Sequence, residues 1–171
     1  MNRSAASREK VLALSAVSAA LMAVGGLISL PLLVVPFTLQ SFFVYLNLLK
    51  LGKSSFIATT IYLGMGLVGL PVFAGGLSGY AVILGPAGGF LLAFVGGSLA
   101  GGAILSKSPG RRYRRLCALL TCAAVMFAVG WLWLSYWVGL SGALWFGVLP
   151  FLPGEGAKIA LALAIGKRMG F

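Results

Sequence analysis

The residues of this sequence best suited to polar chemistry are Glu155 and Lys158, which lie three positions apart in an otherwise apolar segment, 151–165. Residues at this spacing lie on nearly the same face of a helix, so the two side chains can act together. A carboxylate can accept two N–H bonds from a urea-like group, and an ammonium can hold a ligand's carboxylate or carbonyl. Glu155 and Lys158 are therefore the first candidates for ligand contacts.

A purely structural role for the same pair is also open. Pro153 suits the first turn of a helix, where the helix dipole would favour the Glu155 carboxylate, and Lys158 would follow one turn later as an ordinary partner. The sequence has one other carboxylate, Glu9, in its N-terminal tail, and no histidine. Acid–base and metal chemistry therefore have few groups to use, which makes an enzyme a weak alternative and leaves a metal site without ligands.

The composition indicates an integral membrane protein. Of the 171 residues, 60% are hydrophobic and 9% are charged, whereas soluble proteins carry about 25% charged residues. At roughly 20 apolar residues per span, the length allows about six helices with short loops. We expect a single membrane-embedded domain over residues 1–171, with no soluble domain.

Apolar stretches in the sequence predict where these helices lie. The expected segments are 11–35, 37–49, 54–70, one within 80–105, 116–138 and 152–166. The second segment is too short for an ordinary lipid-facing span at 1.5 Å per residue. We therefore expect it either to be buried among its neighbours or to start deep in the membrane.

The cations are distributed as the positive-inside rule requires. They cluster at residues 3–10, 50–53, 107–115 and 167–168, with Lys158 alone outside these groups. Alternating helices place all four clusters on one side of the membrane, which is then cytoplasmic. This predicts six transmembrane helices with both termini inside. The positive-inside distribution thus explains the net charge of +11, and no nucleic-acid partner is expected.

The uncharged run from Pro71 to Phe90 is a second candidate for ligand contact. It is rich in glycine, which permits unusual backbone angles and a close approach of the backbone to a ligand. Non-helical backbone at membrane depth is tolerated only where it is buried in protein or lines a cavity. A plain loop is the alternative, but the length of the run favours a lid or a pocket wall.

Small and aromatic residues form three further patterns. Ala16 and Ala20 form one small-residue face and Gly97 and Gly101 another, either for packing inside the bundle or for docking a second membrane protein. The aromatic cluster at 131–137 is expected to be an interfacial belt at the outer end of its helix.

Together these segments resemble the BioY family, the biotin-binding S components of energy-coupling-factor transporters. The matching pieces come in the family's order and are Val35–Gln40, Gly69–Gly75, Gly85–Phe90 and Phe151–Lys158. The family usually has aspartate at the position of Glu155, so the carboxylate here stands on an arm longer by one methylene.

The resemblance implies an all-α, six-helix S-component-like bundle in the inner membrane of a prokaryotic cell, which captures biotin from the outer side. Biotin would be the transported ligand, with no cofactor. The implied ligand contacts are Glu155, Lys158, Gln40, Gly75, Gly85, Pro86, Gly88, Gly89 and Phe90. The alternatives are an S component for another small vitamin, a membrane-embedded enzyme and an assembly protein.

The resemblance also implies partner subunits. An Ala-xxx-Ala face on the first helix docks the transmembrane coupling subunit in this family, and it maps here to Ala16 and Ala20. Two separate ATPase subunits would supply the energy.

Overall fold

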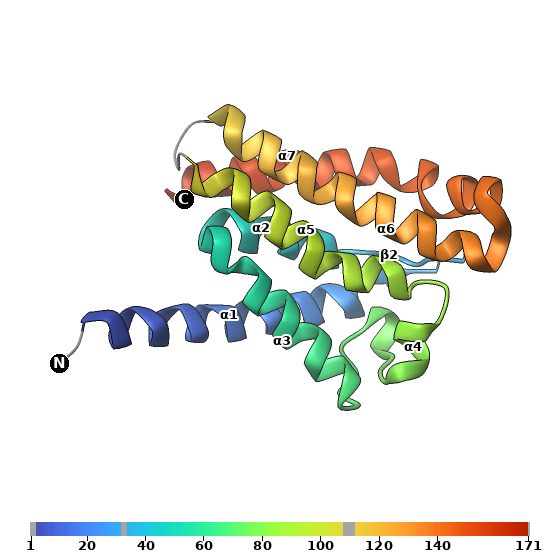
Figure 1. The fold of residues 1–171 in the computed structure, drawn as a ribbon, viewed down its shortest axis with the longest axis horizontal. Coiled ribbons are helices and arrows are strands. Elements are labelled where there is room, and N and C mark those ends of the chain that lie inside the picture. Colours follow the sequence, from blue (N-terminus) through green and yellow to red (C-terminus); the bar gives the residue numbers. More distant parts are fainter. Residues whose placement is uncertain (1–2, 32–33, 108–111, 171) are drawn as a thin grey trace.

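The structure, a computed structural model, describes residues 3–31, 34–107 and 112–170. Residues 32–33, in the predicted first helix, and residues 108–111, in a predicted basic loop, lie outside the described part. The long helices run roughly along one axis, and α1 begins and α7 ends at the same end of the molecule (Figure 1). The all-helical prediction is confirmed.

Seven α-helices and three short 3-10 helices form the described fold, with one small pair of strands. The α-helices are α1 (Arg3–Leu27), α2 (Gln40–Leu51), α3 (Ser55–Leu67), α4 (Tyr80–Leu84), α5 (Gly88–Ser106), α6 (Arg112–Gly147) and α7 (Leu152–Arg168). The 3-10 helices are η1 (Gly52–Ser54), η2 (Ala74–Gly76) and η3 (Leu149–Phe151). The strands β1 (Ser29–Leu30) and β2 (Phe37–Thr38) pair antiparallel.

The predicted first helix, 11–35, extends too far. α1 ends at Leu27, and the chain then turns back through the β1–β2 pair. Pro31 explains the early end, because it has no N–H to bond the carbonyl of Leu27, and Pro36 would interrupt a helix further along the predicted segment. The backbone N–H of Leu39 donates to the carbonyls of Gly25 and Ile28, which fastens the returning strand to the end of α1.

Three described segments are long and apolar enough to cross a membrane: Arg8–Leu27, Gly88–Ser106 and Tyr113–Arg168. The helices α2 and α3 have only 12 and 13 residues. α2 packs against α1, α3, α5, α6 and α7, so it lies in the middle of the bundle. This is the buried short helix that its length predicted. Six crossings of the membrane stay a prediction.

The helices of the structure differ from the predicted helix boundaries in two further places. Residues 140–147, which lie between the predicted helices 116–138 and 152–166, are helical, because α6 continues past a break at Gly139, whose φ of 76° only glycine adopts readily. The predicted fourth helix within 80–105 is divided into α4 and α5. Pro86 stands at this division, where its ring cannot join a continuous helix.

The small-residue face of α5 packs inside the bundle. A Cβ added to Gly97 would lie 2.9 Å from the carbonyl oxygen of Cys122, and one added to Gly101 would lie 2.8 Å from that of Ala118. Both carbonyls belong to α6, so the two backbones touch where these glycines lie. Internal packing, rather than docking of a second protein, therefore explains this face.

We predict that Gly101→Ala destabilises the fold by about 1–3 kcal/mol, because the added methyl would push α5 away from α6. Gly64→Ala in α3 is the matched control, since an added Cβ there has no other atom within 4 Å. It should be neutral or gain up to about 1 kcal/mol in helix propensity. Thermal unfolding in detergent measures both. A midpoint for Gly101→Ala at or above that of Gly64→Ala would contradict the close packing.

Candidate ligand-binding site

Glu155 and Lys158 form a buried ion pair at the start of α7. The Nζ of Lys158 lies 2.6 Å from Oε1 of Glu155, and the two residues are 6% and 7% exposed. Pro153 and Glu155 fall in the first turn of the helix, as their spacing predicted. A buried ion pair is stable only when further hydrogen bonds satisfy its remaining polar groups.

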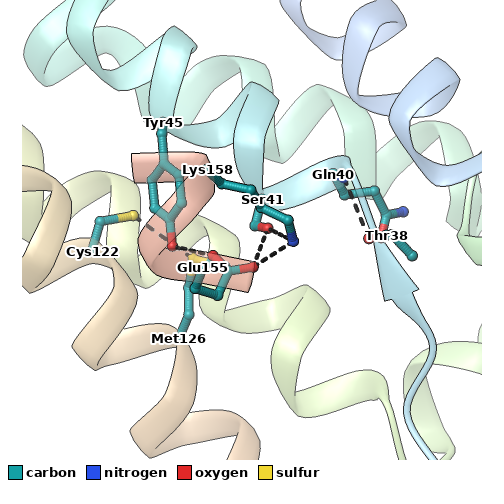
Figure 2. A network of polar contacts seen from close by, with 8 residues as sticks. All are labelled: Thr38, Gln40, Ser41, Tyr45, Cys122, Met126, Glu155 and Lys158. Atoms are coloured by element: carbon teal, nitrogen blue, oxygen red, sulfur yellow. Dashed lines mark hydrogen bonds and ion pairs between the residues drawn. The ribbon is translucent and has the colours of Figure 1, made fainter. Parts of the chain in front are cut away.

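Helix α2 supplies those hydrogen bonds. The hydroxyl of Ser41 donates to Oε1 of Glu155, and the hydroxyl of Tyr45 donates to Oε2, each at 2.6 Å. Ser41 and Tyr45 lie four residues apart, so both reach from one face of α2 toward the Glu155 carboxylate (Figure 2). The Nζ of Lys158 also donates to the hydroxyl of Ser41 at 2.9 Å and lies 4.1 Å from the ring centroid of Phe37.

These contacts leave the pair with little free capacity. A carboxylate has about four acceptor positions and an ammonium three donors. Oε1 of Glu155 already accepts from Ser41 and from Lys158, whereas among the described residues Oε2 accepts from Tyr45 alone. Two donors of Lys158 are engaged, and the Phe37 ring lies against the same ammonium. The pair can therefore accept one further N–H at Oε2 without rearranging, not the two that a free carboxylate could take.

A cavity of about 380 Å³ lies beside this pair. Its volume is within the range of small-molecule sites. Polar side chains reach it only from Thr38, Gln40, Ser41, Glu155 and Lys158 among the described residues. The other lining residues are apolar or glycine: Val34, Val35, Pro36, Ala74, Leu77, Ala81, Val82, Gly85, Pro86, Ala87, Phe90, Leu91, Phe94, Met126, Phe127, Gly147 and Phe151.

The structure brings most of the sequence-predicted contacts to this cavity. Glu155, Lys158, Gln40, Gly85, Pro86 and Phe90 all line it. They come from α2, the α4–α5 junction, α5 and α7, so a glycine-proline segment and the charged pair line the same cavity.

Gly75, Gly88 and Gly89 are not among the residues that line the cavity, and their contact with a ligand stays a prediction. A Cβ added at Gly88 would clash with the carbonyl of Ile83, and one added at Gly89 would clash with Trp133. These two glycines therefore let the start of α5 pack closely on α4 and α6. Gly75 has a φ of 68° and lies in the η2 turn. The preceding residue of that turn, Ala74, does line the cavity.

Trp133 supports the wall of the cavity, a role that the sequence did not indicate. Its Nε1–H donates to the carbonyl oxygen of Gly85 at 2.9 Å. The aromatic cluster at 131–137 is thus divided. Trp133 is half-buried, whereas Tyr136 is 87% exposed and Trp137 49% exposed, as an interfacial belt requires.

A second chain of hydrogen bonds ties the loops beside the cavity to the helices. The hydroxyl of Thr38 donates to Oε1 of Gln40 at 2.9 Å, and Nε2 of Gln40 donates to the hydroxyl of Tyr62. Tyr62 in turn donates to the carbonyl of Val72 at 3.0 Å. β2, α2, α3 and the segment after α3 are therefore joined through side chains. Gln40 both lines the cavity and organises its loops.

Sequence reasoning missed four of these residues. Ser41 and Tyr45 carried a usable signal, because two polar side chains four residues apart in an apolar segment share one face of a helix. Tyr62 and Trp133 carried none, since their partners are backbone carbonyls or side chains distant in the sequence.

Ala16 and Ala20 lie apart from the cavity. Both are exposed on α1, whereas Ser15 and Ala19 on the same helix are fully buried. The small-residue face is therefore exposed on the described chain, and its docking role stays a prediction.

The helical bundle and its cavity define a multi-pass membrane protein with a cavity large enough for a small molecule. The BioY family model matches residues 1–170, and the chain belongs to the BioY family.

Individual relatives agree with this assignment. The chain is 40% identical over 163 residues to a probable biotin transporter of Pyrococcus horikoshii, with 95% of this chain and 97% of that protein covered. It is 36% identical over 152 residues to a biotin transporter of Thermotoga maritima, with 88% and 89% covered.

A solved structure shares the fold. The chain is similar to the crystal structure of an S-component for biotin from an ECF-type ABC transporter, with a TM-score of 0.87 at 29% identity. The similarity covers 99% of this chain and 94% of that one. The expected S-component-like bundle is thus confirmed.

We predict that Lys158→Met costs about 3–5 kcal/mol, because it leaves the buried Glu155 carboxylate without its cation. The double variant Lys158→Met/Glu155→Gln removes both charges and should recover much of that loss. Thermal unfolding in detergent compares the two. Lys53→Met, at an exposed cation, controls for loss of charge alone. A double variant no more stable than Lys158→Met would contradict a coupled, charge-compensating pair.

Proposed function

We propose that this chain is the biotin-binding S component of an energy-coupling-factor importer and captures biotin from the outer side of the membrane. The observation that carries the proposal is the cavity of about 380 Å³ with the Glu155–Lys158 pair in its wall. Membership of the BioY family and similarity to the biotin S-component support it. On this account the chain is a transport protein and not an enzyme, and it has no cofactor of its own.

Biotin combines a ureido ring bearing N–H groups with a thioether ring and an aliphatic chain that ends in a carboxylate. The open position on Oε2 of Glu155 suits one ureido N–H. The apolar lining, including Phe90, Phe94 and Phe127, suits the thioether ring and the chain. The polar ureido ring and the apolar thioether ring and chain of biotin thus match the arrangement of the lining.

We further propose a single domain with six crossings and both termini in the cytoplasm of a prokaryotic cell. α1 begins and α7 ends at the same end of the molecule (Figure 1). Lys50, Lys53, Lys167 and Arg168 close α2, η1 and α7. The positive-inside rule assigns such clusters to the cytoplasm and the cavity end to the outside.

A transmembrane coupling subunit and two ATPase subunits complete the proposed importer. Ala16 and Ala20 form an exposed small-residue face on α1, the kind of surface that lets a second helix approach closely. The similar solved structure is described as the S-component for biotin from an ECF-type ABC transporter, which supports such partners.

We expect Glu155→Ala and Lys158→Ala each to weaken biotin binding by tenfold or more, on the order of 1.4 kcal/mol. Each change removes one half of the polar contact and leaves the other half buried without its partner. Equilibrium binding of labelled biotin to the purified chain measures the effect, and Lys53→Ala is the exposed control. Wild-type affinity in both folded variants would contradict the proposed site.

We expect Ala16→Trp/Ala20→Trp to abolish biotin uptake by the assembled importer while leaving biotin binding unchanged, because bulky side chains would prevent close helix docking. Val17→Trp/Leu21→Trp is the matched control, since both positions are exposed on an adjacent face of α1. Loss of binding in the alanine-face variant would instead assign Ala16 and Ala20 to internal packing. Uptake lost equally in the control would show a general effect on α1.

A further inference from the structure

The cavity offers no uncommitted cation to an anionic ligand. Lys158 is the only cation among the described residues that line the cavity. Its ammonium already donates to Glu155 and Ser41 and lies against the Phe37 ring. The sequence has no other lysine or arginine in 11–49, 54–106 or 116–166. No second basic side chain is therefore close to the cavity along these segments.

Lys158 has little freedom to change partners. If its ammonium moved to a ligand carboxylate, Glu155 would keep its negative charge while only 7% exposed, with hydroxyl donors alone to balance it. A buried carboxylate without its cation is strongly destabilising. A second carboxylate brought next to Glu155 would add like-charge repulsion to this loss.

Glu155 and Lys158 together therefore carry no net charge, and a ligand meets them as a neutral polar patch. Its free acceptor position, on Oε2, suits a neutral N–H group. The ureido ring meets that requirement, and a carboxylate does not. The ring end of the ligand belongs at Glu155, which places the acid end elsewhere in the cavity.

The other end of the cavity is formed by loops and meets solvent. Val34 and Leu77 line it and are 41% and 58% exposed, and their neighbours Pro36 and Ala74 are also apolar. An acid group at this end can keep its hydration but gains no ion pair with a side chain that lines the cavity. Its charge then adds little to binding.

We propose that this protein recognises the ring of biotin and not the charge of its acid group, so that neutral-tailed derivatives, such as the primary amide, are also ligands. This inference rests on the proposed function. It defines the substrate class as ureido-ring compounds with an aliphatic tail whose end is either acid or amide.

Equilibrium binding of three compounds to the purified chain tests the proposal: biotin, its primary amide, and a biotin methylated on the ureido nitrogens. We expect the amide to bind within tenfold of biotin. We expect the methylated ring, which has lost its N–H donors, to bind at least tenfold more weakly. The two analogues change opposite ends of the ligand, so each is the control for the other.

The outcomes separate this inference from the proposed function. Tight binding of biotin with an amide more than tenfold weaker would overturn the inference and leave the function standing. Equal affinity for the ring-methylated compound would also overturn it, because the ring would then not be held through an N–H group. Failure of biotin itself to bind would overturn the proposed function and this inference with it.

Discussion

The ion pair between Glu155 and Lys158 is the interaction on which the rest of the site depends. Two opposite charges buried in an apolar bundle are stable only when neighbouring groups complete their hydrogen bonds. Ser41 and Tyr45 do so from α2, at distances of 2.6–2.9 Å. The start of α7 is thereby fixed against α2, and the cavity takes its polar wall from that junction.

The central position of α2 is what makes this junction available. A helix of 12 residues is too short to face lipid across a whole bilayer, but it can be enclosed by longer neighbours, as α2 is. Close packing of α5 against α4 and α6 helps the longer helices to enclose α2. Gly97 and Gly101 bring α5 against α6, and Gly88 and Gly89 bring the start of α5 against α4 and Trp133. The same glycine-rich region, at Gly85 and Pro86, forms part of the cavity wall.

Much of this arrangement could be predicted from single segments of the sequence. The spacing of Glu155 and Lys158 predicts a shared helix face, and the short apolar segment 37–49 predicts a buried helix. Properties that depend on distant partners could not be predicted in this way. The sequence predicts a surface belt that includes Trp133, because nothing in its own segment indicates the bond to the carbonyl of Gly85. From the sequence, Gly88 and Gly89 fit two roles, since glycine allows close approach of either a ligand or another helix.

The site that results is a charge-neutral polar patch beside an apolar cavity, which suits a ligand with a polar ring and an apolar tail. An experimental structure of the chain with biotin bound tests this claim most directly. The account predicts the ureido ring at Glu155, one ring N–H on Oε2, and the Lys158–Glu155 pair intact, with the carboxylate at the loop end of the cavity. A biotin carboxylate bound to Lys158, with the ion pair broken, would contradict it.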